Sequence, residues 1–143
     1  YMEASKMIKI VYGPKGFGKT KIMIDEVNNA AKTASGNVVF ISDKRFSTVV
    51  IDFNVRCVYT EEHGIKTTQA FIGFINGLLA GNSDIEYIFV DGLKRIIGNE
   101  MADGEELFNA IELLQKEYPD LKFVMSISAE KKDLPKYVFP YIS

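Results

Sequence analysis

Residues 13–20 combine three glycines, two lysines and a threonine at a fixed spacing. They read Gly-Pro-Lys-Gly-Phe-Gly-Lys-Thr and fit the pattern G-x-x-x-x-G-K-[ST] at every fixed position. Glycines let a backbone curl around an anion, and the positive end of a following helix adds favourable potential. The Lys19 ammonium suits outer phosphates, and the Thr20 hydroxyl offers magnesium a hard oxygen. The predicted nucleotide-binding residues are Gly13, Pro14, Lys15, Gly16, Phe17, Gly18, Lys19 and Thr20.

A second chemical signal is an acid at the end of an apolar run. Tyr87-Ile88-Phe89-Val90-Asp91 reads as a buried strand with a carboxylate at its end. An acid in that place would hold the magnesium shell through water, because magnesium keeps several waters and takes few carboxylates. Thr20 and Asp91 are therefore the predicted magnesium residues. Many buried strands also end in an aspartate that only caps the next helix, and this alternative stays open.

The elements that must position these residues alternate between strand and helix. Breaks at Ser35-Gly36-Asn37, Gly81-Asn82 and Tyr118-Pro119 separate apolar runs with strand character from stripes with helical spacing. Thr67 is a predicted helix cap, and Asp103 with Glu106 has capping-box spacing. After Pro135 the tail fits a short helix or an extended segment. The predicted strands are residues 7–12, 38–41, 55–59, 86–91 and 122–127, and the predicted helices begin near Lys19, Thr67 and Asp103.

Alternating strands and helices predict an α/β fold with a mainly parallel central sheet of about five strands and helices on both sides, in three layers. Ligands of such sheets bind beyond the carboxyl ends of the strands. Chemistry is therefore expected where those ends gather. The polar residues predicted at these ends are Gly13–Thr20, Asp43, Glu61, Glu62, Asp91 and Ser126–Ser128.

The two motifs together resemble those of the P-loop NTPase superfamily, with Gly13–Thr20 similar to its Walker A loop and residues 87–91 similar to its Walker B strand. Val90-Asp91-Gly92-Leu93 resembles the Walker B ending of RecA-like ATPases. The predicted strand 38–41 lies between the motifs, which suggests the arrangement of that branch, with a strand inserted between the two motif strands. The resemblance implies a P-loop NTPase fold that binds ATP and Mg²⁺.

Two other branches of the superfamily fit less well. The chain lacks the D-x-x-G and N-K-x-D segments of GTPases, so the resemblance favours ATP over GTP. It also lacks the arginine-rich lid of small-molecule kinases, since its only arginines are Arg45, Arg56 and Arg95. A kinase with the same loop spacing nevertheless stays an alternative.

One position departs from the pattern of many related ATPases, which place Glu directly after the Walker B acid to orient the attacking water. This chain has Gly92 there. RecA-like proteins often carry that acid on a neighbouring strand end, so Asp43, Glu61 and Glu62 are alternatives to it. The predicted catalytic residues are Lys19, Asp43 and Glu62. Ser126 or Ser128 could sense the outer phosphate or simply satisfy backbone groups. A further candidate group could supply charge to the transition state, with surface solvation as the alternative for all four: Arg45, Arg95, Lys94 and Lys15.

Composition limits the classes of protein. A chain of 143 residues with 47% hydrophobic and 25% charged residues predicts one domain over residues 1–143, with residues 1–6 disordered or foreign to a native start at Met7. A net charge of −2 disfavours nucleic-acid binding. The lone Cys57 and the absence of a leader-like start favour the cytoplasm. No apolar run approaches the roughly 20 residues of a membrane span, and His63 lacks companions for zinc.

These observations predict an ATP-binding protein, a magnesium-dependent ATPase that acts as a small nucleotide switch or regulator. Little chain remains to bind another substrate, so a protein partner or a second copy would read the bound state. Loops at 43–54, 61–66 and 94–103 are the expected exposed readout surfaces, because they sit near the phosphates. The alternatives are a nucleotide-binding scaffold that does not hydrolyse and a small-molecule phosphotransferase.

Overall fold

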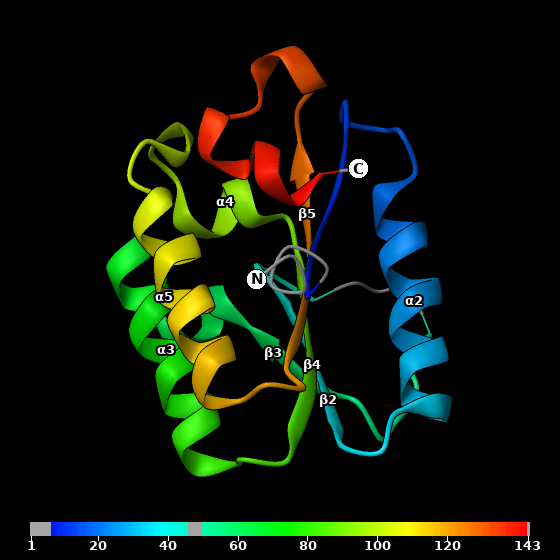
Figure 1. Ribbon diagram of the computed structural model, residues 1–143. Coiled ribbons are helices and arrows are strands. Elements are labelled where there is room, and N and C mark those ends of the chain that lie inside the picture. Colours follow the sequence, from blue (N-terminus) through cyan, green and yellow to red (C-terminus); the bar gives the residue numbers. More distant parts are fainter. Residues whose placement is uncertain (1–6, 46–49, 143) are drawn as a thin grey trace.

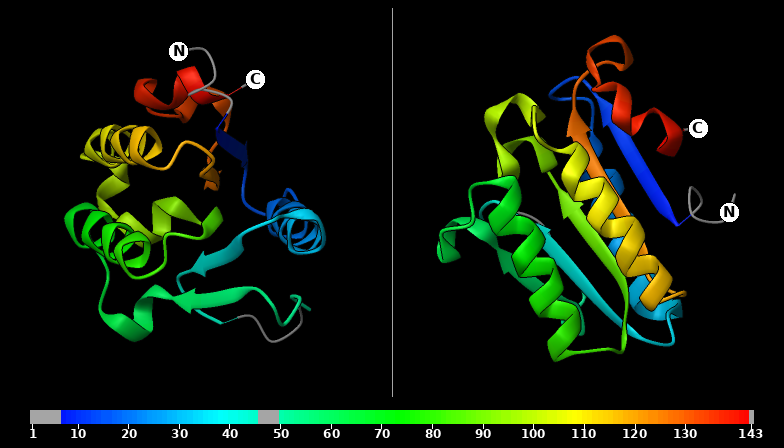
Figure 2. Two further views of the ribbon diagram at one scale, coloured as in Figure 1. Left: turned by 60° about the horizontal axis from the view of Figure 1, so that its bottom comes forward. Right: turned by 60° about the vertical axis from the view of Figure 1, so that its left-hand side comes forward.

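Five parallel strands in the order β1-β5-β4-β2-β3 form the central sheet of the computed structural model, which describes residues 7–45 and 50–142 (Figure 1). Helix α2 (Lys19–Thr33) covers one face, and α3 (Thr68–Gly81) and α5 (Glu105–Glu117) cover the other (Figure 2). This confirms the predicted α/β class and parallel sheet, and it is compatible with three layers. The predicted disorder of residues 1–6 lies outside the described residues. The strands are β1 (Ile8–Gly13), β2 (Asn37–Ser42), β3 (Arg56–Tyr59), β4 (Ile85–Asp91) and β5 (Lys122–Ser128).

The order of the strands differs from the prediction in one respect. One strand does lie between β1 and β4, but it is the last strand, β5, and not the strand predicted at 38–41. That strand, β2, pairs with β4 on its other side and with β3. Sequence order does not determine spatial order, because the crossover through α5 returns the chain into the gap beside β1. Ser126 and Asp91 therefore lie on neighbouring strands.

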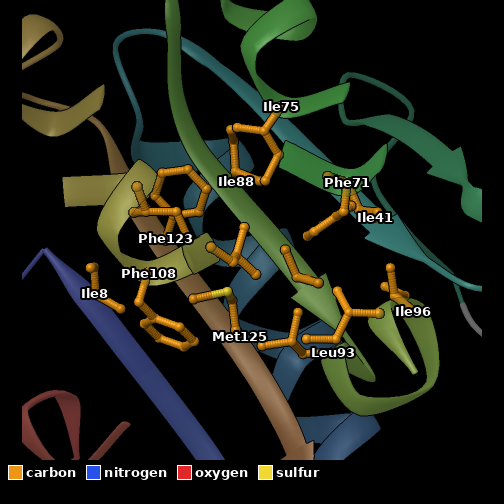
Figure 3. Packing of buried hydrophobic residues seen from close by; sticks show 14 of the residues in the cluster. Ile8, Ile41, Phe71, Ile75, Ile88, Leu93, Ile96, Phe108, Phe123 and Met125 are labelled. Carbon is orange, nitrogen blue, oxygen red and sulfur yellow. The ribbon is translucent and has the colours of Figure 1, made fainter. Parts of the chain in front are cut away.

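Side chains of the strands are buried on both faces of the sheet. In β2, Val39 and Ile41 join the larger apolar cluster beneath α3, α4 (Leu93–Ile97) and α5, while Val38 and Phe40 join the smaller one beneath α2. Figure 3 shows part of the larger cluster, with Phe71 of α3 beside the sheet. Each fully buried large apolar side chain stabilises the fold by about 1.5–3 kcal/mol. A continuous apolar run therefore suits a strand in this position.

The start of α3 matches its prediction, whereas the start of α5 does not. Thr67 Oγ1 accepts a hydrogen bond from the Ala70 N–H at 3.1 Å, as expected of a helix cap. The capping box predicted for Asp103 and Glu106 is wrong, because α5 has no side-chain cap. Asp103 instead accepts from the Thr68 hydroxyl at 2.7 Å, and Glu106 accepts from the side chain of Gln69. The two acids thus join α5 to α3, whose N-terminus lies beside them.

The segment predicted as an exposed loop at 94–103 is partly folded into the core. It contains α4 (Leu93–Ile97) and the 3₁₀ helix η2 (Asn99–Met101). The side chains of Ile96, Ile97 and Met101 are buried in the larger apolar cluster. The prediction of an exposed loop is therefore wrong for these residues, since their apolar side chains find room under α3 and α5.

Short 3₁₀ helices form within the predicted loop at 61–66 and within the tail. Residues 60–63 form the 3₁₀ helix η1 (Thr60–His63), and Ile65 after it is buried. The tail forms the 3₁₀ helices η3 (Lys131–Asp133) and η4 (Lys136–Tyr141), which favours the helical alternative. Within loop 43–54, residues 46–49 lie outside the described part. None of the helices in the described ranges combines the length and apolar character that crossing a membrane requires.

Candidate functional site

A cavity of about 400 Å³ opens at the carboxyl edge of the sheet, where β1 leads into α2. Figure 1 shows this edge at the top, with the start of α2 and α4 on either side of it. The Gly13–Thr20 loop supplies most of its lining, and the ends of β4 and β5 together with α4 supply the rest. The lining residues are Lys15, Gly16, Gly18, Lys19, Thr20, Asp91, Arg95, Ser126 and Ser128.

The backbone of the Gly13–Thr20 loop depends on two glycines. Gly16 and Gly18 have φ angles of 85° and 81°, in the left-handed region that residues with a Cβ enter only at a cost. Gly18 is the N-cap residue of α2, which has no side-chain cap and no acid in its first turn. Helix α2 thus begins at the cavity with no acid of its own first turn beside its N-terminal amides, which favours an anion there.

Three residues of the loop take supporting places instead of lining the cavity. The Phe17 side chain is 65% exposed, and its ring packs over Gly13, where an added Cβ would come within 2.8 Å of it. The carbonyl of Pro14 accepts hydrogen bonds from the Phe17 N–H and from Lys19 Nζ. Gly13, Pro14 and Phe17 thus shape the loop, while the other five residues line its inner side.

Lys19 is the buried cation of the loop. It is 7% exposed, and its Nζ donates to the Pro14 carbonyl oxygen at 2.8 Å. Burial lowers the pKa of Lys19; nearby Asp91 opposes this shift and Arg95 adds to it. The ammonium is thus held inside the loop by one carbonyl, which leaves its other N–H donors available in the cavity.

Asp91 is a buried carboxylate in a small hydrogen-bond network. Its Oδ1 accepts from the Ser126 hydroxyl at 3.0 Å, and Ser126 Oγ accepts from the Gly92 N–H at 2.8 Å. Its Oδ2 lies 3.5 Å from Thr20 Oγ1. Burial raises the pKa of Asp91, although the bond from Ser126 and the charge of Arg95 work against the rise. A hydroxyl and a carboxylate oxygen side by side are the hard donors that magnesium takes, so Thr20 and Asp91 fit that ion.

Asp43 lies behind the cavity wall and contacts it through Arg95. Arg95 Nε donates to Asp43 Oδ2 at 3.0 Å, and Arg95 Nη2 donates to Asp43 Oδ1 at 3.3 Å. Nη2 also lies 3.7 Å from Asp91 Oδ2. Burial acts to raise the pKa of Asp43, but the hydrogen bonds and charge of Arg95 outweigh it and lower that pKa. An ionised carboxylate that already accepts two hydrogen bonds from an arginine is a poor acceptor of a further proton.

Glu62 lies away from the cavity. Its carboxylate accepts from Arg45 Nε at 2.7 Å, and this exposed pair does not line the cavity. The hydrogen bonds from Arg45 lower the pKa of Glu62, and the Arg45 guanidinium stacks 4.7 Å from the centre of the Tyr59 ring. Glu61 contributes its N–H to the Asp43 carbonyl instead of a carboxylate to the site. The structure therefore brings Lys19, Thr20 and Asp91 together and leaves Glu61 and Glu62 apart.

The Ser126 hydroxyl gives a testable link between the site and stability. Ser126→Ala should reduce the free energy of unfolding by about 1–3 kcal/mol, because it leaves the Gly92 N–H and one Asp91 oxygen without a partner. Urea unfolding of the variant would measure this. Ser128→Ala is the control, since its half-buried side chain makes no hydrogen bond in the described ranges, and a change within about 0.5 kcal/mol is expected. Equal losses in both variants would contradict the network.

The sequence indicates Arg95 only as one of four cations, with Arg45, Lys94 and Lys15, that could supply charge to the transition state, and it does not place Arg95 beside Asp91. The available signal was its spacing, four residues after Asp91 on a helix that starts at the end of β4, which turns the side chain back toward that acid.

A scan against models of known protein families finds no match to this chain, and a search of the curated proteins finds none either. The geometry of the cavity and the two motifs therefore carry the functional argument.

Proposed function

We propose that the cavity binds ATP with Mg²⁺ and that the chain is a P-loop NTPase of the RecA-like branch. The observation that carries this proposal is the meeting of two motifs in one cavity. Thr20 Oγ1 and Asp91 Oδ2 lie 3.5 Å apart although 71 positions separate them in the sequence. The strand inserted between β1 and β4 adds support, because the same insertion characterises the branch that the motifs resemble.

In this proposal the loop, the start of α2 and Asp91 have distinct tasks. The loop amides and the start of α2 bind the phosphates, and the Lys19 ammonium neutralises the outer ones. Thr20 and Asp91 hold magnesium, whose charge offsets that of the phosphate oxygens. ATP is favoured over GTP because the guanine-reading segments of GTPases are missing from the sequence.

Hydrolysis is slow in this proposal, or it waits for a partner. Asp91 is the only carboxylate among the described residues that line the cavity. Gly92 offers no side chain, Asp43 is bonded to Arg95, and Glu62 is bonded to Arg45. The chain then serves as a small cytoplasmic nucleotide switch, read by a protein partner or a second copy. The same observation also favours a second candidate, a scaffold that binds ATP without hydrolysing it.

Calorimetric titration of the wild-type chain with ATP, ADP and GTP, each with and without Mg²⁺, tests the proposal. ATP with Mg²⁺ should bind most tightly, and GTP should bind more weakly. Phosphate release measured alongside supports the switch where turnover occurs, whereas the scaffold predicts no release even with a protein partner present. If ATP fails to bind at about 1 mM, a concentration that detects interactions worth roughly 4 kcal/mol, the proposal is wrong.

A further inference from the structure

The Gly13–Thr20 loop supplies two cations to the cavity lining, Lys15 and Lys19, whereas the guanidinium of Arg95 comes from a different element, α4. We propose that Arg95 is a direct ligand of the terminal phosphate and that Asp43 is the residue that positions it. The site would then bind a nucleoside triphosphate more tightly than the diphosphate. This inference rests on the proposed function and names the feature of the ligand that the site recognises.

The orientation of Arg95 is determined by a carboxylate that itself cannot move freely. Asp43 accepts from Nε and Nη2 of Arg95 at 3.0 and 3.3 Å, a paired arrangement that determines the plane of the guanidinium. The Asp43 side chain is only 8% exposed, and its carboxylate also accepts from the Ser42 hydroxyl at 3.3 Å. Asp43 follows directly after β2, a strand in the interior of the sheet. The guanidinium is thus held by a buried residue that directly follows an interior strand.

The same arrangement leaves part of the guanidinium available to a ligand. Nη1 has no hydrogen-bond partner within residues 7–45 and 50–142, and the Arg95 side chain is 47% exposed at the cavity. Arginine keeps its charge at any physiological pH, and its planar set of donors matches phosphate oxygens. Arg95 therefore presents free donors of permanent charge to whatever anion enters.

Gly92 makes room for this guanidinium. A Cβ built at position 92 would come within 2.2 Å of Arg95 Nη2. The residue also has a φ angle of 82°, which disfavours any side chain there. Where the resemblance implies a glutamate after the acid, this chain therefore has a glycine and fills the space with an arginine. The departure at Gly92 and the placement of Arg95 are two parts of one arrangement.

The position of Arg95 points to the outer end of the ligand. Its Nη2 lies 3.7 Å from Asp91 Oδ2, the oxygen that also lies 3.5 Å from Thr20 Oγ1. In the proposed function these two oxygens would hold the magnesium that neutralises the outer phosphates of a triphosphate. A guanidinium beside that position would lie within reach of the terminal phosphate. A diphosphate has lost this group, so it would lose the contact with Arg95.

A purely structural role for Arg95 makes a different prediction. If the guanidinium only neutralised Asp43 and Asp91, removing it would change the affinities for triphosphate and diphosphate together, or change neither. If it contacts the terminal phosphate, only the triphosphate affinity falls. The ratio of the two affinities therefore distinguishes a ligand from a neutralising charge, and it does so even when a variant is less stable.

The experiment is calorimetric titration with β,γ-imido-ATP and with ADP in the presence of Mg²⁺. Arg95→Gln and Asp43→Asn should each lower the affinity for the triphosphate about 10-fold, the worth of one charge-assisted contact, and change that for ADP less than about threefold. The double variant should lose no more than Arg95→Gln alone, because Asp43 acts through Arg95. It also avoids leaving an unpaired buried carboxylate. Arg56→Gln is the matched control. Arg56 lies at the amino end of β3, away from the carboxyl edge where the cavity opens, so no change in either affinity is expected.

A measurement on the wild type covers the case in which a variant does not fold. The Nε–H resonance of Arg95 in a nitrogen–proton correlation spectrum should shift with β,γ-imido-ATP and stay in place with ADP. Equal losses for the two nucleotides, no loss, or an Arg95 resonance that ignores the terminal phosphate would each overturn this inference alone. Failure of the wild type to bind either nucleotide would overturn the proposed function together with it.

Discussion

Lys19→Ala is expected to weaken the binding of ATP with Mg²⁺ by about 100-fold, the largest effect of any single substitution in the loop. The physical reason is the loss of a buried ammonium from a cavity that also contains a buried carboxylate. Lys19 is the only lysine whose side chain is buried among the described residues, and burial already lowers its pKa. A bound triphosphate would offset this cost of burying the ammonium, because its negative charge would pair with the positive charge of Lys19. Calorimetric titration of wild type and variant measures the difference.

Lys21→Ala is the matched control for this substitution. Lys21 lies two positions further along α2, pairs with Asp25 at 3.0 Å, and is exposed to solvent. It removes the same charge from the same helix turn without touching the cavity, so a change of less than about threefold is expected, as for an exposed pair. A loss of equal size in the two variants would mean that only the general positive potential of α2 matters. An unchanged affinity in Lys19→Ala would contradict the proposed role of the loop.

The parts of the site that could be predicted from the sequence are those whose geometry is local. Gly16, Gly18, Lys19 and Thr20 are neighbours along the chain, so one strand, one turn and one helix start suffice to bring them together. The strands and helices were also predicted from local patterns, and their bounds match the observed elements to within a few residues. Asp91 could be placed at the correct edge because parallel strands align their carboxyl ends.

The parts that could not be predicted depend on which elements become neighbours in space. Nothing local shows that β5 inserts between β1 and β4, and this insertion is what brings Ser126 to Asp91. The partners of Asp43 and Asp103 were missed for the same reason. Each acid was interpreted through its own segment, but Asp43 bonds to Arg95 and Asp103 bonds to Thr68 across the fold. A charged side chain takes the strongest partner within reach, and tertiary structure decides what is within reach.

Asp91→Asn is expected to abolish the dependence of ATP binding on Mg²⁺, the second large effect. In the wild type Mg²⁺ should tighten ATP binding at least about 10-fold, and in the variant it should change binding less than about twofold. The amide keeps the shape of the side chain, and its oxygen can still accept from Ser126. The amide lacks the negative charge with which the carboxylate would bind magnesium. Parallel titrations with and without Mg²⁺ measure the effect, and Asp84→Asn, an exposed acid near the start of β4, is the control.

Stability separates a lost metal ligand from a damaged fold. Burial raises the pKa of Asp91 above its ordinary value, so the folded chain favours the protonated carboxyl. The stabilisation from that preference is full at pH values below the unfolded pKa and is lost as the pH rises through the folded one. Above the folded pKa, where Asp91 is ionised, this stabilisation is absent, and Asp91→Asn should unfold there at no lower urea concentration than the wild type. If Asp91→Asn keeps the stability of the wild type and Mg²⁺ still tightens its ATP binding fully, the metal binds away from Asp91. Equal stability would exclude damage to the fold as the explanation.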